Sequence, residues 1–214
     1  MPPNKVLSPS ADEAARSHAE AQRQRILDAA QQCFIGRGFH AGSISDIAAE
    51  ANISQGLMYR YFDNKRTLIL ALIERQLAHD QEAMRHPPAP ADLIESLLVC
   101  YQHWARGETL ETRGSTIASV VLFAQINAEA HRDPVIAEVV RNHDKQIGEA
   151  IAQWLRRHDQ ERGRASDEAA VQQRVLLLRA LVEGLAMRAV RDPDLQADTL
   201  RGVLTAAISQ ALPE

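Results

Sequence analysis

The chain has 214 residues, of which 45% are hydrophobic and 24% are charged, and its formal net charge is −4. These values are typical of a folded globular protein and argue against a disordered chain. No apolar run approaches the roughly 20 residues that a membrane span needs. Aromatic residues make up only 4%, and the abundance of Ala, Leu, Arg, Gln and Glu favours helices. The composition therefore predicts an all-α fold, and the acidic net charge does not by itself suggest a nucleic-acid partner.

Residues 1–15 are rich in Pro, Ser and Asn and are predicted to form a disordered leader. They contain no apolar segment of the kind found in secretory signals. Cys33 and Cys100 lie in unrelated patterns, so we expect both thiols to be reduced and buried in a cytoplasmic protein. The sequence has no metal-ligand spacing, no glycine-rich phosphate loop and no nucleophile motif. We therefore expect no enzyme activity, no metal and no cofactor.

The first long helix is predicted from about Arg16 to Arg37, with Gly36 and Gly38 ending it. One apolar face recurs at helical spacing along it, consisting of Ile26, Ala30, Cys33 and Phe34. The region between Arg16 and Arg66 carries seven basic and five acidic residues. Any affinity of this region for DNA must therefore come from the position of its charges rather than from their number.

Two short helices with a turn between them are predicted from Ser43 to Lys65. Ser43 and Asp46 have the spacing of a capping box, which marks the start of the first of these helices. Its buried face is predicted to consist of Ile44, Ile47, Ala48 and Ala51. Asn52 tolerates the left-handed conformation that a sharp helix exit requires. This pattern predicts a short helix followed by a tight turn.

Ser54 is positioned to cap the second short helix, in which Met58 and Phe62 are predicted to face inward. This layout is typical of a helix-turn-helix, whose second helix enters the DNA major groove. Glutamine can read adenine, and arginine, lysine and hydroxyl groups can hold phosphates. The candidate DNA-binding residues are Ser43, Ser54, Gln55, Gly56, Leu57, Tyr59, Arg60, Tyr61 and Lys65. We assign residues 16–66 to this DNA-binding domain.

Several motifs in this stretch resemble those of the tetracycline-repressor (TetR) family of bacterial regulators. They are Asp46-Ile47-Ala48, Ile53-Ser54-Gln55-Gly56, Tyr59-Arg60-Tyr61-Phe62 and Lys65. The sequence departs from the family at Asn52, where glycine is commoner, and at Leu57-Met58, where Thr-Leu is common. Leu57 offers no hydroxyl to a phosphate and is instead expected to touch a thymine methyl group. The resemblance implies a homodimer that binds a palindromic double-stranded operator and is released by a small molecule.

A fourth helix is predicted from residues 63–65 to about Arg85, ending at the prolines of residues 87–90. We interpret it as the connection to a helical effector-binding and dimerisation domain, residues 67–214. The helices of that domain are predicted over residues 91–106, 115–130, 134–158, 167–190 and 195–212, about nine helices for the whole chain. His131-Arg132-Asp133-Pro134 and Arg191-Asp192-Pro193 separate some of them. No strand pattern and no internal repeat is present.

The last two helices carry apolar stripes that are wider than one partner requires. Two such helices from each of two chains can form a four-helix bundle. The predicted dimer-interface residues are Val175, Leu178, Val182, Leu185, Leu200, Val203, Leu204 and Ile208. The alternative is that these side chains fill the core of their own chain, and the family resemblance favours the interface.

A small hydrophobic or aromatic effector is expected to bind among the aromatic side chains of the second domain, where a few polar groups can fix its orientation. The candidate residues are Tyr101, His103, Trp104, Phe123, Asn127, His143, Trp154, Glu183 and Met187. Each of them can alternatively belong to the core or the surface. Two other functions stay open: a helix-turn-helix regulator controlled by a protein partner, and a helical enzyme or lipid carrier. No membrane partner is expected.

Overall fold

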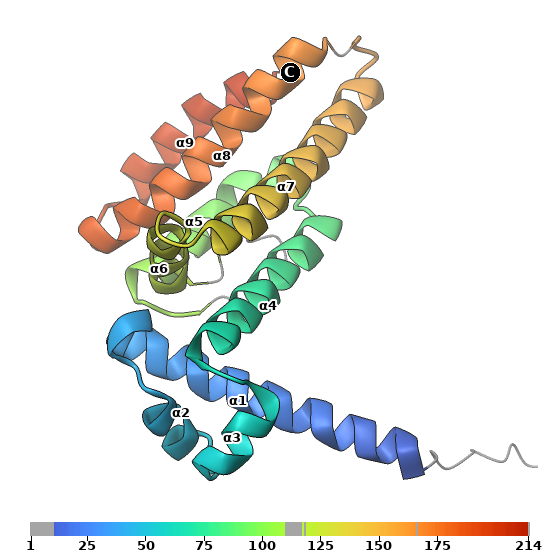
Figure 1. Ribbon diagram of the computed structural model, residues 1–214. Helices are drawn as coiled ribbons and strands as arrows, with labels where there is room; N and C mark the ends of the chain where they lie inside the picture. The colour runs from blue at the N-terminus through green and yellow to red at the C-terminus, as the bar shows by residue number, and fades with distance from the viewer. Residues whose placement is uncertain (1–10, 110–116, 118, 166, 214) are drawn as a thin grey trace, which may run out of the picture. The chain divides into compact units, whose positions relative to one another are not determined.

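The computed structural model (Figure 1) describes residues 11–109, 117, 119–165 and 167–213, with residues 11–15 described by backbone alone. Within these ranges the chain forms nine α-helices and one short 3-10 helix, and no strand. This confirms the predicted all-α fold. None of the described helices is long and apolar enough to cross a lipid bilayer. The chain divides into two compact units, Met1–Leu72 and Ile73–Glu214, which we call the head and the body.

The head consists of α1 (Ala11–Ala41), α2 (Ile44–Glu50), α3 (Gln55–Tyr61) and the first turns of α4 (Lys65–Arg85). Helix α1 begins at Ala11, so residues 11–15 of the predicted leader are helical, and residues 1–10 lie outside the described residues. The largest fully buried side chains of the head are Ile26, Leu27, Phe34, Ile47, Met58, Leu68 and Leu72. They join all four helices in one core.

Two glycines fix the path of the chain between α1 and α2. Gly38 has φ of 82° and ψ of 162°, so the helix breaks there as the sequence predicts, although one further turn follows to Ala41. At Gly42 a Cβ atom would lie 3.0 Å from both Cys33 Sγ and Phe34 Cδ1. Only glycine allows this close approach without moving the core. The turn therefore holds the start of α2 directly against α1.

The body begins in α4, because the division between the two units falls within that helix. Its further helices are η1 (Pro90–Asp92), α5 (Leu93–Ala105), α6 (Val120–Ala130), α7 (Pro134–Glu161), α8 (Glu168–Arg191) and α9 (Ala197–Ala211). Their bounds match the predicted ranges within a few residues, except that α6 begins at Val120 after a Ser119 cap. Residues 115, 116 and 118 of that prediction lie outside the described residues. Figure 1 shows α8 and α9 side by side.

The apolar stripes of α8 and α9 face the core of their own chain. Six of the predicted interface residues are buried there, namely Val175, Leu178, Leu185, Leu200, Leu204 and Ile208. Val182 is partly buried against the same core, and Val203 is 54% exposed. The large apolar side chains that α8 and α9 do expose are Leu176, Val190 and Val203. The predicted set is thus largely buried within the single chain, and its part in a dimer interface stays a prediction.

Candidate DNA interface and ligand cavity

The start of α2 is fixed by a capping box, as the sequence predicts. Ser43 Oγ accepts a hydrogen bond from the Asp46 backbone N–H at 3.1 Å, and Asp46 Oδ2 accepts one from the Ser43 N–H at 3.0 Å. The Ser43 hydroxyl also donates to Asp46 Oδ2 at 2.6 Å. This bond, followed by the backbone bond and the charge of Arg37, lowers the pKa of Asp46. The hydroxyl of Ser43 is thus engaged in positioning α2.

The turn and the start of α3 also match their predictions. Asn52 has φ of 52°, the left-handed conformation expected for it. Ser54 Oγ caps α3 by accepting a hydrogen bond from the Leu57 N–H at 3.2 Å. Met58 and Phe62 are buried beneath the helix. The turn, the cap and the two buried anchors together fix which face of α3 points outward.

That outer face of α3 carries four of the nine candidate DNA-binding residues. Gln55, Gly56, Tyr59 and Arg60 are exposed, and Tyr59 is 51% exposed although it is a large aromatic residue. At 100° per residue these four positions lie within one side of the helix. Leu57 and Tyr61 are half-buried at its edges. The helix therefore presents amide, phenol and guanidinium groups together on one surface.

Lys65 lies at the start of α4, where the Asn64 side chain caps the helix by accepting a hydrogen bond from the Thr67 N–H at 2.9 Å. The Lys65 ammonium donates to the His40 carbonyl at 2.8 Å. An ammonium has three protons to donate. This bond therefore holds Lys65 against the end of α1 and leaves protons that can reach a phosphate.

The body contains a partly open cavity of about 240 Å³. It is lined by residues of α4, α5, α6, α7 and α8 and of the segments that connect them. Six of the predicted effector residues line it: Trp104, Phe123, Asn127, His143, Trp154 and Glu183. The Trp104 ring is held by a hydrogen bond of 2.8 Å from its Nε1–H to the Ile117 carbonyl. Both tryptophans of the chain thus form part of the cavity wall.

Three other predicted effector residues do not line this cavity. The Tyr101 hydroxyl donates to the Asp192 carbonyl at 2.6 Å, which ties α5 to the end of α8. His103 Nδ1 lies 2.7 Å from a carboxylate oxygen of Glu108. Met187 packs against the core of the body. Tyr101 and His103 therefore have polar partners outside the cavity wall, and Met187 contributes to the core.

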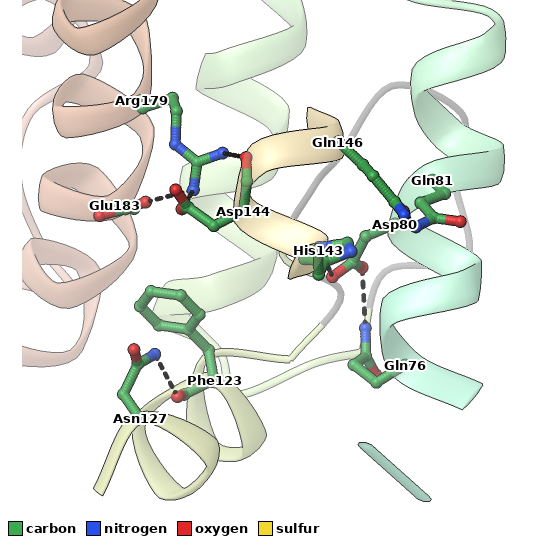
Figure 2. Close-up of polar contacts among 10 residues, drawn as sticks. All are labelled: Gln76, Asp80, Gln81, Phe123, Asn127, His143, Asp144, Gln146, Arg179 and Glu183. Atoms are coloured by element: carbon green, nitrogen blue, oxygen red, sulfur yellow. Dashed lines mark hydrogen bonds and ion pairs between the residues drawn. The ribbon is translucent and has the colours of Figure 1, made fainter. Parts of the chain in front are cut away.

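A buried carboxylate, Asp80, was missed by the sequence analysis. It is 5% exposed and accepts a hydrogen bond from Gln76 Nε2 at 3.0 Å, while His143 Nε2 lies 3.7 Å from its other oxygen (Figure 2). Burial raises the pKa of Asp80 to about 8. Burial and then the charge of Arg179 lower the pKa of His143 to about 4. Burial thus favours the neutral form of both groups, although their separation is that of a possible ion pair.

Figure 2 shows a second polar group, formed by Arg179, Asp144 and Glu183, apart from Asp80 and Gln76. Arg179 Nη2 contacts Asp144 Oδ1 and lies 3.1 Å from Glu183 Oε1, and its Nη1 donates to the Asp144 carbonyl at 3.2 Å. The guanidinium is thus balanced by two carboxylates. Of this group the sequence analysis identified only Glu183, because charges on α7 and α8 follow the same pattern as an ordinary solvated helix face.

Comparison with known families assigns both parts of the chain. Residues 26–72 match the family described as bacterial regulatory proteins, tetR family, and residues 107–213 match the BetI-type transcriptional repressor, C-terminal. The HTH-type transcriptional regulator UidR of Escherichia coli strain K12 is 32% identical over 168 residues. That alignment covers 76% of this chain and 79% of UidR.

Solved structures with the same fold cover nearly the whole chain. Salmonella enterica GusR superposes with a TM-score of 0.65 at 27% identity, covering 96% of this chain and 100% of GusR. A putative transcriptional regulator from Saccharomonospora viridis, solved in complex with choline, superposes with a TM-score of 0.67 at 23% identity. It covers 89% of this chain and 96% of the other, and this likeness concerns the fold alone.

Proposed function

This chain belongs to the tetR family of bacterial regulatory proteins, and on that premise we propose that it is a cytoplasmic repressor that a small-molecule effector releases from a palindromic operator. Members of the family are transcriptional regulators rather than enzymes, and they bind operator DNA and act as dimers. The observation that carries the proposal is the cavity of about 240 Å³ in the body of a chain whose head carries a helix-turn-helix.

In this proposal α3 reads the operator. Gln55 contacts a base edge, and Tyr59 and Arg60 hold the phosphate backbone from the same exposed face. Lys65 supplies a further phosphate contact from the start of α4. Ser43 and Ser54 act through their caps, which fix α2 and α3 in the orientation that the base contacts need.

The dimer is proposed to form through the outer faces of α8 and α9. Leu176 is 69% exposed, and Val203 is the exposed member of the predicted set. Ala180, Gly184 and Ala206 are exposed on the same two helices, and such small side chains allow helices to approach closely. A four-helix bundle built from these faces would cover apolar side chains that solvent otherwise contacts.

Control is proposed to follow from unequal binding of the effector to two conformations. A ligand in the cavity changes operator affinity only if it binds the DNA-competent conformation and the released one unequally. A coupling of about 1–3 kcal/mol is typical and corresponds to about a 5- to 150-fold loss of operator affinity. Helix α4 is the element proposed to carry the change, because it is continuous from Lys65 to Arg85 and its second part lines the cavity.

The test combines ligand screening with operator titration. Thermal shift of the purified protein identifies small molecules that stabilise it, and fluorescence anisotropy with a labelled operator measures how each of them changes DNA affinity. We expect stabilising molecules to lower operator affinity, and operator DNA to weaken their binding by the same factor. Molecules that stabilise the protein yet leave operator affinity unchanged would contradict the proposal and favour control by a protein partner.

A further inference from the structure

We propose that the effector is an organic cation with an apolar body, and that the Asp80 carboxylate is the partner of its positive charge. This inference rests on the proposed function, because it names the chemical class of the molecule that the cavity binds. It is carried by the charges of the cavity wall, by the burial of Asp80 and by the aromatic side chains that line the same cavity.

The ionisable side chains of the cavity wall are mainly acidic. Among the described residues that line it, the carboxylates are Asp80, Asp144 and Glu183, against the single guanidinium of Arg179 and the imidazole of His143. Arg179 already contacts both Asp144 and Glu183. It is therefore not free to balance Asp80, and an anion entering the cavity would meet more negative than positive charge. The wall thus favours a cation.

A bound cation would give the Asp80 carboxylate a partner of opposite charge. This carboxylate is buried on α4, and its partners in the described part of the chain are the Gln76 amide and the distant His143 ring. Burial of a carboxylate without a cationic partner is costly, and burial accordingly raises its pKa to about 8. His143 Nε2 lies 3.7 Å from the carboxylate, and burial and the neighbouring Arg179 disfavour its charged form by lowering its pKa to about 4. A bound cation would stabilise the ionised form and release the proton.

The remaining wall fits the apolar part of such a molecule. Trp104, Phe123 and Trp154 line the cavity together with aliphatic side chains of α5, α7 and α8. The faces of aromatic rings attract cations, most strongly away from water. A ligand with one positive charge and a compact apolar or aromatic body would therefore satisfy both Asp80 and the wall. A neutral ligand that only accepts a hydrogen bond from protonated Asp80 is the competing arrangement.

Three probes of similar size separate these arrangements: benzylammonium, benzyl alcohol and benzoate share one ring and differ in charge. Binding is followed by tryptophan fluorescence, because Trp104 and Trp154 are the only two tryptophans of the chain and both line the cavity. We expect benzylammonium to bind more tightly than the alcohol, and benzoate to bind most weakly. Equal or tighter binding of the alcohol or benzoate, or no response to benzylammonium at millimolar concentration, would overturn the proposal.

The variant Asp80→Asn keeps the shape of the side chain and removes its charge. We expect it to bind benzylammonium about 10- to 100-fold more weakly, as for loss of a buried charged hydrogen-bond partner, and to bind benzyl alcohol with little change. Glu74→Gln is the matched control, because Glu74 is an exposed carboxylate on the same helix and does not line the cavity. A charge preference that survives in Asp80→Asn would overturn the role of Asp80.

The pH dependence of the unmodified protein tests the same contact without a mutation. Because the cation displaces a proton from Asp80, benzylammonium affinity should rise by up to about tenfold per pH unit from pH 6 to pH 8. Benzyl alcohol affinity should not rise. The other ionisable side chains that line the cavity are His143, whose pKa burial lowers to about 4, and Asp144, Glu183 and Arg179, of which Arg179 contacts both carboxylates. An affinity for the cation that is independent of pH would contradict the proposal.

Operator titration with the same probes distinguishes failure of this inference from failure of the proposed function. Binding of the cation that depends on Asp80 but leaves operator affinity unchanged would support the cation site and remove effector-controlled release. Release of the operator by neutral or anionic molecules would support the regulator and overturn the cation site.

Discussion

The head and the body build their functional surfaces over different ranges of the sequence. The reading face of α3 lies on one seven-residue helix, and each cap that orients it joins residues three positions apart. The cavity is lined by residues from Gln76 to Glu183, drawn from five helices. The head also keeps its charged groups largely at the surface, whereas the body encloses Asp80 and half-encloses His143. The body therefore contains a carboxylate whose burial opposes its ionisation.

The largest expected effect is a loss of stability, which a charge in the core of the body should cause and a charge on its outer face should not. Leu204 is fully buried, so Leu204→Arg should destabilise the body by about 4 kcal/mol or more, because the charge has no partner there. Leu176→Arg with Val203→Arg should instead leave the body folded and weaken the dimer. Circular dichroism and light scattering measure the two effects. If Leu204→Arg gives a folded monomer, Leu204 belongs to the dimer interface, as the sequence predicts. If the unmodified protein is itself a monomer, the proposed dimer is wrong.

The next effect tests whether the reading face acts locally. Gln55→Ala should reduce discrimination between operator and scrambled DNA by about 1–3 kcal/mol, the range for a bidentate base contact. The variant should keep its thermal stability, because Gln55 is exposed. Anisotropy titration of both DNAs measures the discrimination, and tryptophan fluorescence of the body provides the control. Unchanged discrimination would mean that Gln55 does not read a base.

A third effect concerns the pH dependence of folding of the body. Folded Asp80 has a pKa of about 8 against an ordinary 3.8, and folded His143 has about 4 against 6.5. Between pH 4 and 6.5 the folded state carries one more proton on Asp80 and one fewer on His143 than the unfolded state does. The two contributions to the pH dependence of the free energy of unfolding therefore cancel. Between pH 6.5 and 8 only Asp80 differs, and the free energy of unfolding should fall by about 2 kcal/mol as pH rises.

The variant Asp80→Asn isolates the imidazole. Its stability should rise from pH 4 to pH 6.5, where the unfolded state alone protonates His143, and should stay constant above. Urea unfolding followed by tryptophan fluorescence reports on the body directly. The same fall between pH 6.5 and 8 in Asp80→Asn as in the unmodified protein would assign the dependence to another group.

The smallest effect concerns the charges of the head. Arg60→Gln should weaken binding to all DNA sequences about equally and reduce the slope of log affinity against log salt by about one per protomer. Arg75→Gln is a suitable control, because Arg75 lies in α4 beyond the head. Loss of sequence preference in Arg60→Gln, with an unchanged salt slope, would show that Arg60 reads bases rather than phosphates.

The sequence predicts features that depend on near neighbours in the chain better than features that depend on contacts between distant residues. The Ser43–Asp46 box, the Asn52 turn and the Ser54 cap depend on neighbours within a few residues, and the structure confirms all three. Helix bounds in the body follow from capping and proline signals in the same way. The inward direction of Leu204 depends on how α9 packs against other helices, which the apolar period alone cannot determine.

The cavity shows the same limit. Trp104, Phe123 and Trp154 could be selected because aromatic residues are rare in this chain. Asp80 could not be selected from the sequence, because it lies in a polar stretch of α4 between His79 and Gln81. Nothing in that stretch indicates which of the three polar side chains is buried. The pairing of Asp80 with Gln76 is a common surface spacing. The burial of Asp80 depends on side chains distant in the sequence, such as His143 of α7, which lies 3.7 Å from its carboxylate.

The burial of Asp80 has a consequence for the ways in which this protein can change under selection. Substitutions that make residue 80 neutral or apolar remove an unfavourable group from the interior, so a search for heat-stable variants should collect them. The same variants would lose the charge that we assign to effector recognition. Stability and inducibility are thus opposed at a single codon. Retention of aspartate there in a population grown without the effector would mean that the side chain serves some other requirement.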